Sequence, residues 1–348
     1  MHFLRNEFID QLRADIDETT GNIVIEAAQF TPQEILETDR EMFEDEFEKW
    51  RERRREQLLE KAEQILSLYD NRDRFCRLQQ AYLRDSVLPF VGAGLSIPSG
   101  YPGWTEYLYC LREETSVSET DLTCLINSGE YEAAAQLLFD DMSQDSFNEH
   151  LENKFDNDKK LEGFVRFLPD YFPQSGIITT NFDNVIDRCY EAAQKSFSEK
   201  LLGADARQLL RYLGEGKRVL VRLHGRASSS HKRILTKQEY EQYYVDGKTI
   251  ESSIEAMATK TLLFLGCSLV SDRNIDCLKS LASTKGRESV VRHYAFLAIG
   301  DDKAERLKRK KELTAASIFP IWYPANNDHD ECLMALFTKL AENTEGSI

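Results

Sequence analysis

Residues 87–104 read V-L-P-F-V-G-A-G-L-S-I-P-S-G-Y-P-G-W, and this stretch decides how the rest of the chain is interpreted. Its first five residues are apolar and predict a short buried strand. A tight turn follows at Gly92, Ala93 and Gly94, whose amides are suited to holding a pyrophosphate. Ser96 places a hydroxyl just past this turn. The full dinucleotide fingerprint is missing, because Ile97 stands where its third glycine would fall. An ordinary glycine turn in an α/β domain is the alternative at this point.

The composition is that of a soluble globular chain. Of 348 residues, 41% are hydrophobic and 30% are charged, and no apolar run approaches the ~20 residues of a membrane span. We find no secretory leader and therefore expect a cytoplasmic protein. The net charge of −16 argues against direct, non-specific binding to nucleic acid, which needs a cationic surface.

The seven cysteines do not form a recognisable framework. Their number is odd and no two are spaced as C-x-x-C, which argues against a zinc ribbon and against a set of disulfides. We expect reduced, buried thiols and no structural zinc.

Apolar strands alternate with helical segments along most of the chain. Six strands are predicted at residues 87–91, 176–180, 218–223, 261–265, 293–299 and 318–323. This alternation indicates a Rossmann-like α/β fold with a mainly parallel six-stranded sheet and helices on both faces. Residues 104–172 predict a helical insertion whose first helix starts near Trp104.

The N-terminal part has a different pattern. From Thr31 to Ser86 the chain lacks glycine and, after Pro32, proline, which predicts a long helical stretch. We therefore expect residues 1–84 to be a helical extension used in assembly and residues 85–348 to be the catalytic domain.

Polar motifs follow four of the predicted strands. Besides the glycine turn, these are T-T-N-F-D with Asn181 and Asp183, L-H-G with His224, and L-G-C-S-L with Gly266 and Ser268. Ligands of open α/β sheets bind in the crevice at the carboxyl ends of the strands. The four motifs are therefore predicted to converge on one site.

Together and in this order, G-A-G-x-S, T-T-N-F-D, L-H-G and L-G-C-S-L resemble the sirtuin fold, and specifically its sirtuin-like NADase branch. The resemblance covers roughly residues 85–342. P-x-W at residues 102–104, I-L-T-K-Q-E-Y at 234–240 and F-L-G-C-S-L-V-S-D at 264–272 are also similar to this branch.

The resemblance implies a role for each motif. The first turn would hold the NAD pyrophosphate and the nearby ribose. Asn181 would orient the nicotinamide ribose and the attacking water, Asp183 would lie near the carboxamide, and His224 would be the catalytic base. Gly266 and Ser268 would contact the phosphate or the adenosine ribose. An imidazole that titrates near neutral pH suits the histidine's task.

Two departures separate this chain from protein-deacylating sirtuins. Where those enzymes have P-D-F-R, residues 102–104 are P-G-W, with no arginine. Their two C-x-x-C pairs for structural zinc are also missing, since no cysteine lies between Gly225 and Thr261. NAD is therefore expected as a substrate and zinc is not.

The resemblance implies an NAD+ glycohydrolase that releases ADP-ribose and nicotinamide and depletes NAD in antiphage defence by abortive infection. Control by homo-oligomerisation or by a partner, in some members a HerA-like ATPase, is expected. An NAD-dependent protein deacylase and a non-catalytic subunit that binds NAD or ADP-ribose are the alternatives.

Overall fold

The computed structural model describes residues 2–16, 23–25, 28–30, 34, 38–229, 233–246, 249–270, 273–286 and 288–342. Its centre is a seven-stranded sheet in which every pairing is parallel. In spatial order the strands are β5 (Glu199–Leu202), β6 (Val219–Arg222), β4 (Ile177–Thr179), β3 (Val87–Val91), β7 (Thr261–Leu265), β8 (His293–Ile299) and β9 (Ile318–Pro324).

The six predicted strands are confirmed, and the bounds of β3, β7 and β8 agree to the residue. The predicted number of strands is wrong by one, because the sheet also contains β5. This strand lies at the edge and pairs only with β6. Its sequence, E-K-L-L, begins with two charged residues and lacks an apolar run, as is usual for edge strands that must avoid further pairing.

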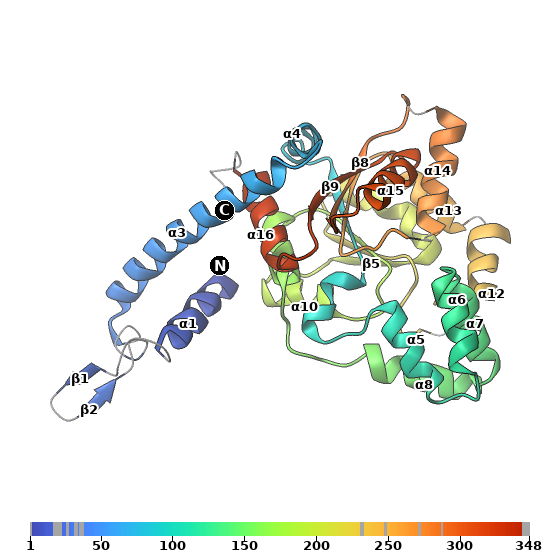
Figure 1. Ribbon diagram of the computed structural model, residues 1–348, viewed down its shortest axis with the longest axis horizontal. Helices are drawn as coiled ribbons and strands as arrows, with labels where there is room; N and C mark the ends of the chain where they lie inside the picture. Colours follow the sequence, from blue (N-terminus) through green and yellow to red (C-terminus); the bar gives the residue numbers. More distant parts are fainter. Residues whose placement is uncertain are drawn as a thin grey trace.

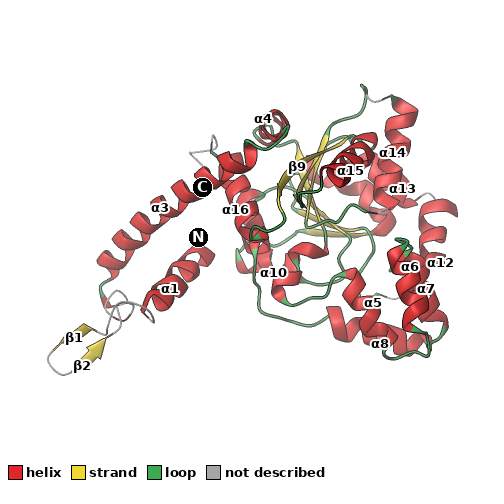
Figure 2. Ribbon diagram, viewed as in Figure 1, coloured by secondary structure: helices red, strands yellow, loops and turns green. Residues whose placement is uncertain are grey.

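Helices cover both faces of the sheet, as predicted (Figure 2). Alternate residues of β3 enter two different cores, since Val87 and Val91 belong to one and Leu88 and Phe90 to the other. The first core is closed by helices that include α10 (Val185–Ala192) and α16 (His329–Leu340). The second is closed by α11 (Leu209–Gly214), α13 (Thr249–Met257), α14 (Arg273–Lys285) and α15 (Lys303–Ala315).

The segment between β3 and β4 is helical and packs on the first core. It contains α5 (Trp104–Arg112), α6 (Glu119–Asn127), α7 (Tyr131–Asp140), α8 (Gln144–Phe155), η3 (Phe164–Phe167) and α9 (Leu168–Tyr171). The predicted helix start near Trp104 is confirmed, since α5 begins at that residue.

The long N-terminal helical stretch is two helices, α3 (Arg40–Leu66) and α4 (Asn71–Tyr82). They are separated at Tyr69, whose φ of 51° lies in the left-handed region and cannot continue an α-helix. Asp39 caps α3. The predicted start at Thr31 lies outside the described residues.

Figure 1 shows α1 (His2–Ile16) and the first half of α3 projecting from the sheet as an arm, with the short hairpin of β1 (Ile23–Ile25) and β2 (Ala28–Phe30) at its far end. Phe8, Phe47 and Trp50 form a separate aromatic core between the two helices. The second half of α3 and α4 belong to the main core, and Asn71 hydrogen-bonds the backbone of Trp322 in β9.

All seven cysteines are free thiols, but the prediction that they are buried is wrong for most of them. Only Cys189 and Cys332 are buried, whereas Cys76 and Cys124 are exposed. None of the described helices has the length and apolar character that crossing a bilayer requires.

Candidate functional site

The four motifs begin from one row of paired residues across the sheet. Val91 at the end of β3 pairs with Thr179 of β4 and with Leu265 of β7, and Thr179 pairs in turn with Arg222 of β6. Two of the predicted motifs begin at their member of this row, Thr179 or Leu265, and the other two begin directly after theirs. The row therefore places the four loops side by side at the carboxyl edge of the sheet, around the point where the chain reverses its direction of winding.

The two glycine turns are locked to each other. The amide of Gly92 donates to the carbonyl of Leu265 at 2.8 Å, and the amide of Gly94 donates to that of Gly266 at 2.9 Å. A Cβ on Gly92 or Gly94 would lie 2.6 or 2.7 Å from the carbonyl oxygen of Gly266, which no side chain tolerates. These two amides, expected to hold a pyrophosphate, are thus used in loop pairing, and the glycines serve the close approach of two loops.

Gly266 itself has a φ of +62°, and a Cβ there would lie 2.6 Å from the backbone nitrogen of Leu95. Ala93 begins a short 3₁₀ turn, η1 (Ala93–Leu95), and its carbonyl accepts from the amide of Ser96 at 2.8 Å. This turn directs the buried Ser96 side chain toward the loop that follows β4.

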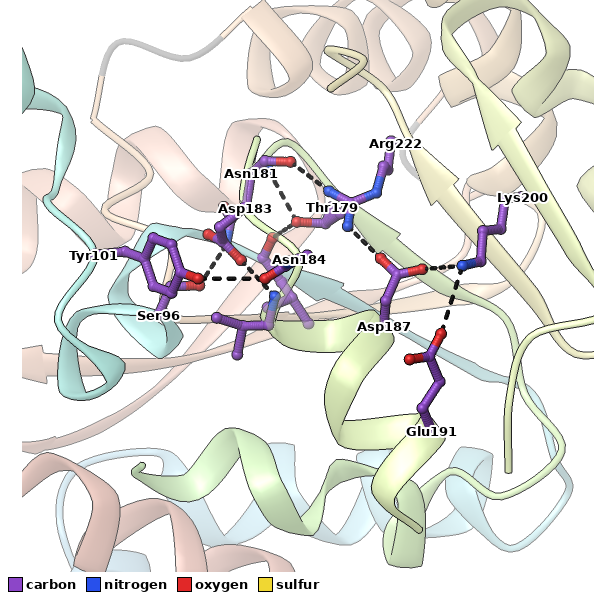
Figure 3. A network of polar contacts seen from close by, with 12 residues as sticks. Ser96, Tyr101, Thr179, Asn181, Asp183, Asn184, Asp187, Glu191, Lys200 and Arg222 are labelled. Carbon is purple, nitrogen blue, oxygen red and sulfur yellow. Dashed lines mark hydrogen bonds and ion pairs between the residues drawn. The ribbon is translucent and has the colours of Figure 1, made fainter. Parts of the chain in front are cut away.

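Asn181 joins the first two motifs (Figure 3). Its Nδ2 donates to the Ser96 hydroxyl at 3.2 Å, and its backbone amide donates to Thr179 Oγ1 at 3.0 Å. The Thr179 hydroxyl in turn donates to the carbonyl of Val91 at 2.8 Å. Both the backbone and the side chain of Asn181 are therefore fixed to β3 and its turn.

Asp183 lies two residues further on and is 3% exposed. Its Oδ1 accepts from the amide of Val185 at 3.0 Å and so secures the first turn of α10. Burial raises the pKa of the Asp183 carboxyl above its ordinary value, against the opposing effects of Arg222 and of the Ser96 hydroxyl. Burial therefore outweighs the neighbouring charge of Arg222 in setting the pKa of Asp183.

An arginine that the sequence analysis did not single out lies beneath Asn181. Arg222 is 1% exposed, and its Nη1 donates to the carbonyl of Asn181 at 3.0 Å. Its Nη2 pairs with the buried Asp187, which also meets Lys200 Nζ at 2.6 Å (Figure 3). Burial alone would raise the pKa of Asp187, but Arg222 and Lys200 outweigh burial and hold it below its ordinary value. The signal in the sequence was an arginine inside an otherwise apolar strand.

His224 lies two residues beyond Arg222, in the position that Asn181 occupies relative to Thr179, and is 4% exposed. Its Nε2 is 2.8 Å from the Tyr244 hydroxyl, and its Nδ1 is 3.4 Å from the Tyr240 hydroxyl. Burial lowers the pKa of His224 to about 3. The expected titration near neutral pH is therefore wrong for this state of the protein, because the low-dielectric surroundings disfavour the imidazolium.

Ser268, after β7, is exposed, and its carbonyl accepts from Arg309 at 2.6 Å. The residues that follow it, Leu269 and Val270, line a cleft of about 630 Å³ between α7, α14 and α15. Asp272, the last residue of the quoted motif, lies outside the described residues. Within the described ranges, no cluster of three or more histidine, cysteine, aspartate or glutamate side chains could hold a metal ion.

The chain is similar in sequence to several known proteins. A SIR2-like domain model matches residues 175–321, which include the loops of Asn181, His224 and Gly266. The chain is 27% identical over 212 residues to the protein named NAD(+) hydrolase ThsA of Acinetobacter baumannii, covering 60% of this chain and 41% of that protein. It is 24% identical over 289 residues to the ThsA of Bacillus cereus, covering 76% of this chain and 55% of the relative.

A third relative, Defense-associated sirtuin 2 of Bacillus subtilis, is 26% identical over 225 residues, which are 63% of this chain and 22% of that protein. The chain thus spans about half the length, or less, of these relatives. The order of the last three motifs and the doubly wound sheet agree with the domain match. Residues 175–321 therefore form a SIR2-like domain, which contains three of the four loops that meet at the carboxyl edge of the sheet.

Proposed function

We propose that this protein is an NAD+ glycohydrolase that cleaves NAD+ to ADP-ribose and nicotinamide and depletes NAD in antiphage defence. The observation that carries the proposal is the single row of strand ends from which the Asn181, His224, Ser96 and Gly266 loops emerge. The names of the relatives, NAD(+) hydrolase and Defense-associated sirtuin, support the same activity.

The chemistry suits the residues. Hydrolysis breaks the bond between the ribose C1 and the nicotinamide nitrogen; the electron pair leaves with neutral nicotinamide, and positive charge develops at C1. Water then adds to C1 and gives up a proton. In this proposal the Asn181 amide, held by Ser96 and the backbone, orients the ribose or the water, and neutral His224 receives the proton.

Both side chains are largely enclosed, with 7% of Asn181 and 4% of His224 exposed. We further propose that the protein is cytoplasmic and that assembly of several copies, or a partner such as a HerA-like ATPase, controls its activity. The projecting arm of α1 and α3 is a candidate surface for such assembly (Figure 1).

The test is nicotinamide release from free NAD+ by the full chain, measured by chromatography with and without the product of a neighbouring gene. Asn181→Ala and His224→Ala should each abolish release. Asn184→Ala is the matched control, because it removes an amide from the same loop that contacts Asp158 and Tyr101 rather than Ser96. Release only in the presence of an acyl-lysine peptide would indicate a deacylase, and tight binding of NAD or ADP-ribose without release would indicate a binding subunit.

A further inference from the structure

The surroundings of His224 contain a chain of hydrogen bonds that links four segments of the protein. His224 follows β6, Tyr240 ends α12 (Lys237–Tyr240), and Tyr244 lies in the π-helix Glu241–Asp246. Both tyrosine rings meet the imidazole edge-to-face, with centroids 5.3 and 6.1 Å away. Asn274 of α14, itself 2% exposed, contacts Tyr244 from the other side.

The two contacts of the imidazole differ in strength. The distance from Nε2 to the Tyr244 hydroxyl is 2.8 Å, a normal hydrogen bond, whereas Nδ1 and the Tyr240 hydroxyl are 3.4 Å apart, at the long limit. The contact at Nδ1 is therefore the weaker of the two.

The direction of these bonds follows from proton counting. A tyrosine hydroxyl has one proton, and that of Tyr244 is donated to Asn274 Oδ1 at 3.0 Å. The Tyr244 oxygen must then accept from His224, so that Nε2 carries the hydrogen. A neutral imidazole has only one N–H, so its Nδ1 holds the lone pair.

We propose that Tyr244 and Asn274 are positioning residues that fix His224 as the Nε2–H tautomer and make Nδ1 the nitrogen that receives the proton from water. The inference rests on the proposed NAD+ hydrolysis. In that step the water oxygen bonds to C1, its proton passes to Nδ1 as the nicotinamide departs with the electron pair, and Nδ1 then returns the proton to solvent. The role parallels that of groups which hold a catalytic imidazole in one tautomer in other hydrolases.

The tautomer can be measured independently of activity. In the full chain labelled with ¹⁵N-histidine, His224→Ala identifies the His224 signals among the six histidines. At pH 7 the wild type should show a protonated Nε2 and an unprotonated Nδ1. Tyr244→Phe should give a mixture of tautomers. Tyr243→Phe, the same chemical change one residue away, should leave the signals unchanged.

Kinetics provide the second readout. Tyr244→Phe should lower kcat for nicotinamide release about 10- to 100-fold with little change in KM, within the range that a positioned base contributes. Asn274→Leu should do the same if Tyr244→Phe fails to fold. A protonated Nδ1 in the wild type, or an unchanged kcat in both variants, would overturn the proposal. If Tyr244→Phe changes the tautomer of His224 as expected but neither the wild type nor any variant cleaves NAD+, the assignment of Tyr244 as a positioning residue stands and the proposed function fails.

Discussion

Replacing Asp187 by asparagine should destabilise the protein strongly, because the change leaves Arg222 charged and buried without its partner. The two side chains are only 2% and 5% exposed. Two unit charges about 4 Å apart interact by about 4 kcal/mol at an effective dielectric constant of about 20. Breaking a buried pair costs about 3–5 kcal/mol by mutagenesis, so both arguments give the same size. We expect a loss of that order in the free energy of unfolding, measured by urea titration.

The matched control is Glu191→Gln, which removes the other carboxylate near Lys200. That pair is 3.9 Å apart and its members are 41% and 56% exposed, so its loss should cost at most about 1 kcal/mol. The double variant Arg222→Met with Asp187→Leu should recover most of the stability lost in Asp187→Asn, since no charge is left buried.

Activity should separate from stability in the same series. The double variant should fold, because it leaves no buried charge. It should nevertheless release nicotinamide slowly, because the carbonyl of Asn181 has lost the hydrogen bond from Arg222. In Asp187→Asn, Arg222 keeps a positive charge that no carboxylate balances. This variant should also release nicotinamide slowly, because the reaction develops positive charge nearby. If the free energy of unfolding of Asp187→Asn lies within about 1 kcal/mol of the wild-type value, the argument that Arg222 depends on Asp187 for its burial is wrong.

Three further results are expected. Gly94→Ala should lower the free energy of unfolding by about 1–3 kcal/mol and reduce NAD+ cleavage, because its Cβ would lie 2.7 Å from a backbone oxygen of the facing loop. Gly103→Ala, whose Cβ would meet its nearest neighbour at 3.7 Å, should melt like the wild type. Equal melting temperatures of the two variants would contradict the argument that the two glycine turns are locked together. Burial lowers the pKa of His293 to about 3. Between pH ~6.5 and about 3 the unfolded chain therefore binds a proton at this residue that the native protein does not. As the pH is lowered through this range, the free energy of unfolding should fall by about 1.4 kcal/mol per pH unit for this group. His293→Gln should reduce that slope in urea titrations at several pH values, and an unchanged slope would exclude His293 as its source. Because the pKa of His224 is also lowered to about 3, the wild-type profile of kcat/KM against pH should show no inflection near 6.5. An inflection there that coincides with protonation of the His224 ¹⁵N signals would show that His224 titrates as an open histidine.

Sequence patterns predicted the inner strands of the sheet better than its edge strand β5. Strands that are buried on both faces, such as β3 and β7, are continuous apolar runs, and their bounds are visible in the sequence. The edge strand β5 is half charged and gains its pairing from β6 alone, so local pattern does not reveal it. The break between α3 and α4 was missed because it comes from the left-handed backbone at Tyr69 rather than from a glycine or proline.

The candidate site shows the same division. The motifs after the strands could be placed at one edge because parallel strands share a direction, and the register row agrees with that expectation. The contacts of Arg222, Tyr244 and Asn274 depend on the packing of distant segments, which no local pattern encodes. The charge state of His224 likewise depends on its burial by these segments, so its low pKa could not be foreseen from L-H-G alone.

The row through Val91, Thr179, Arg222 and Leu265 also has a consequence during synthesis. The two glycine turns that lock together are separated by about half of the chain, and the row is complete only after Leu265 and the loop to Ser268 have left the ribosome. Pairings over such separations form late, because the intervening chain must first be ordered. A nascent or truncated chain that ends before β7 therefore contains Asn181 and His224 but cannot hold them in a working site.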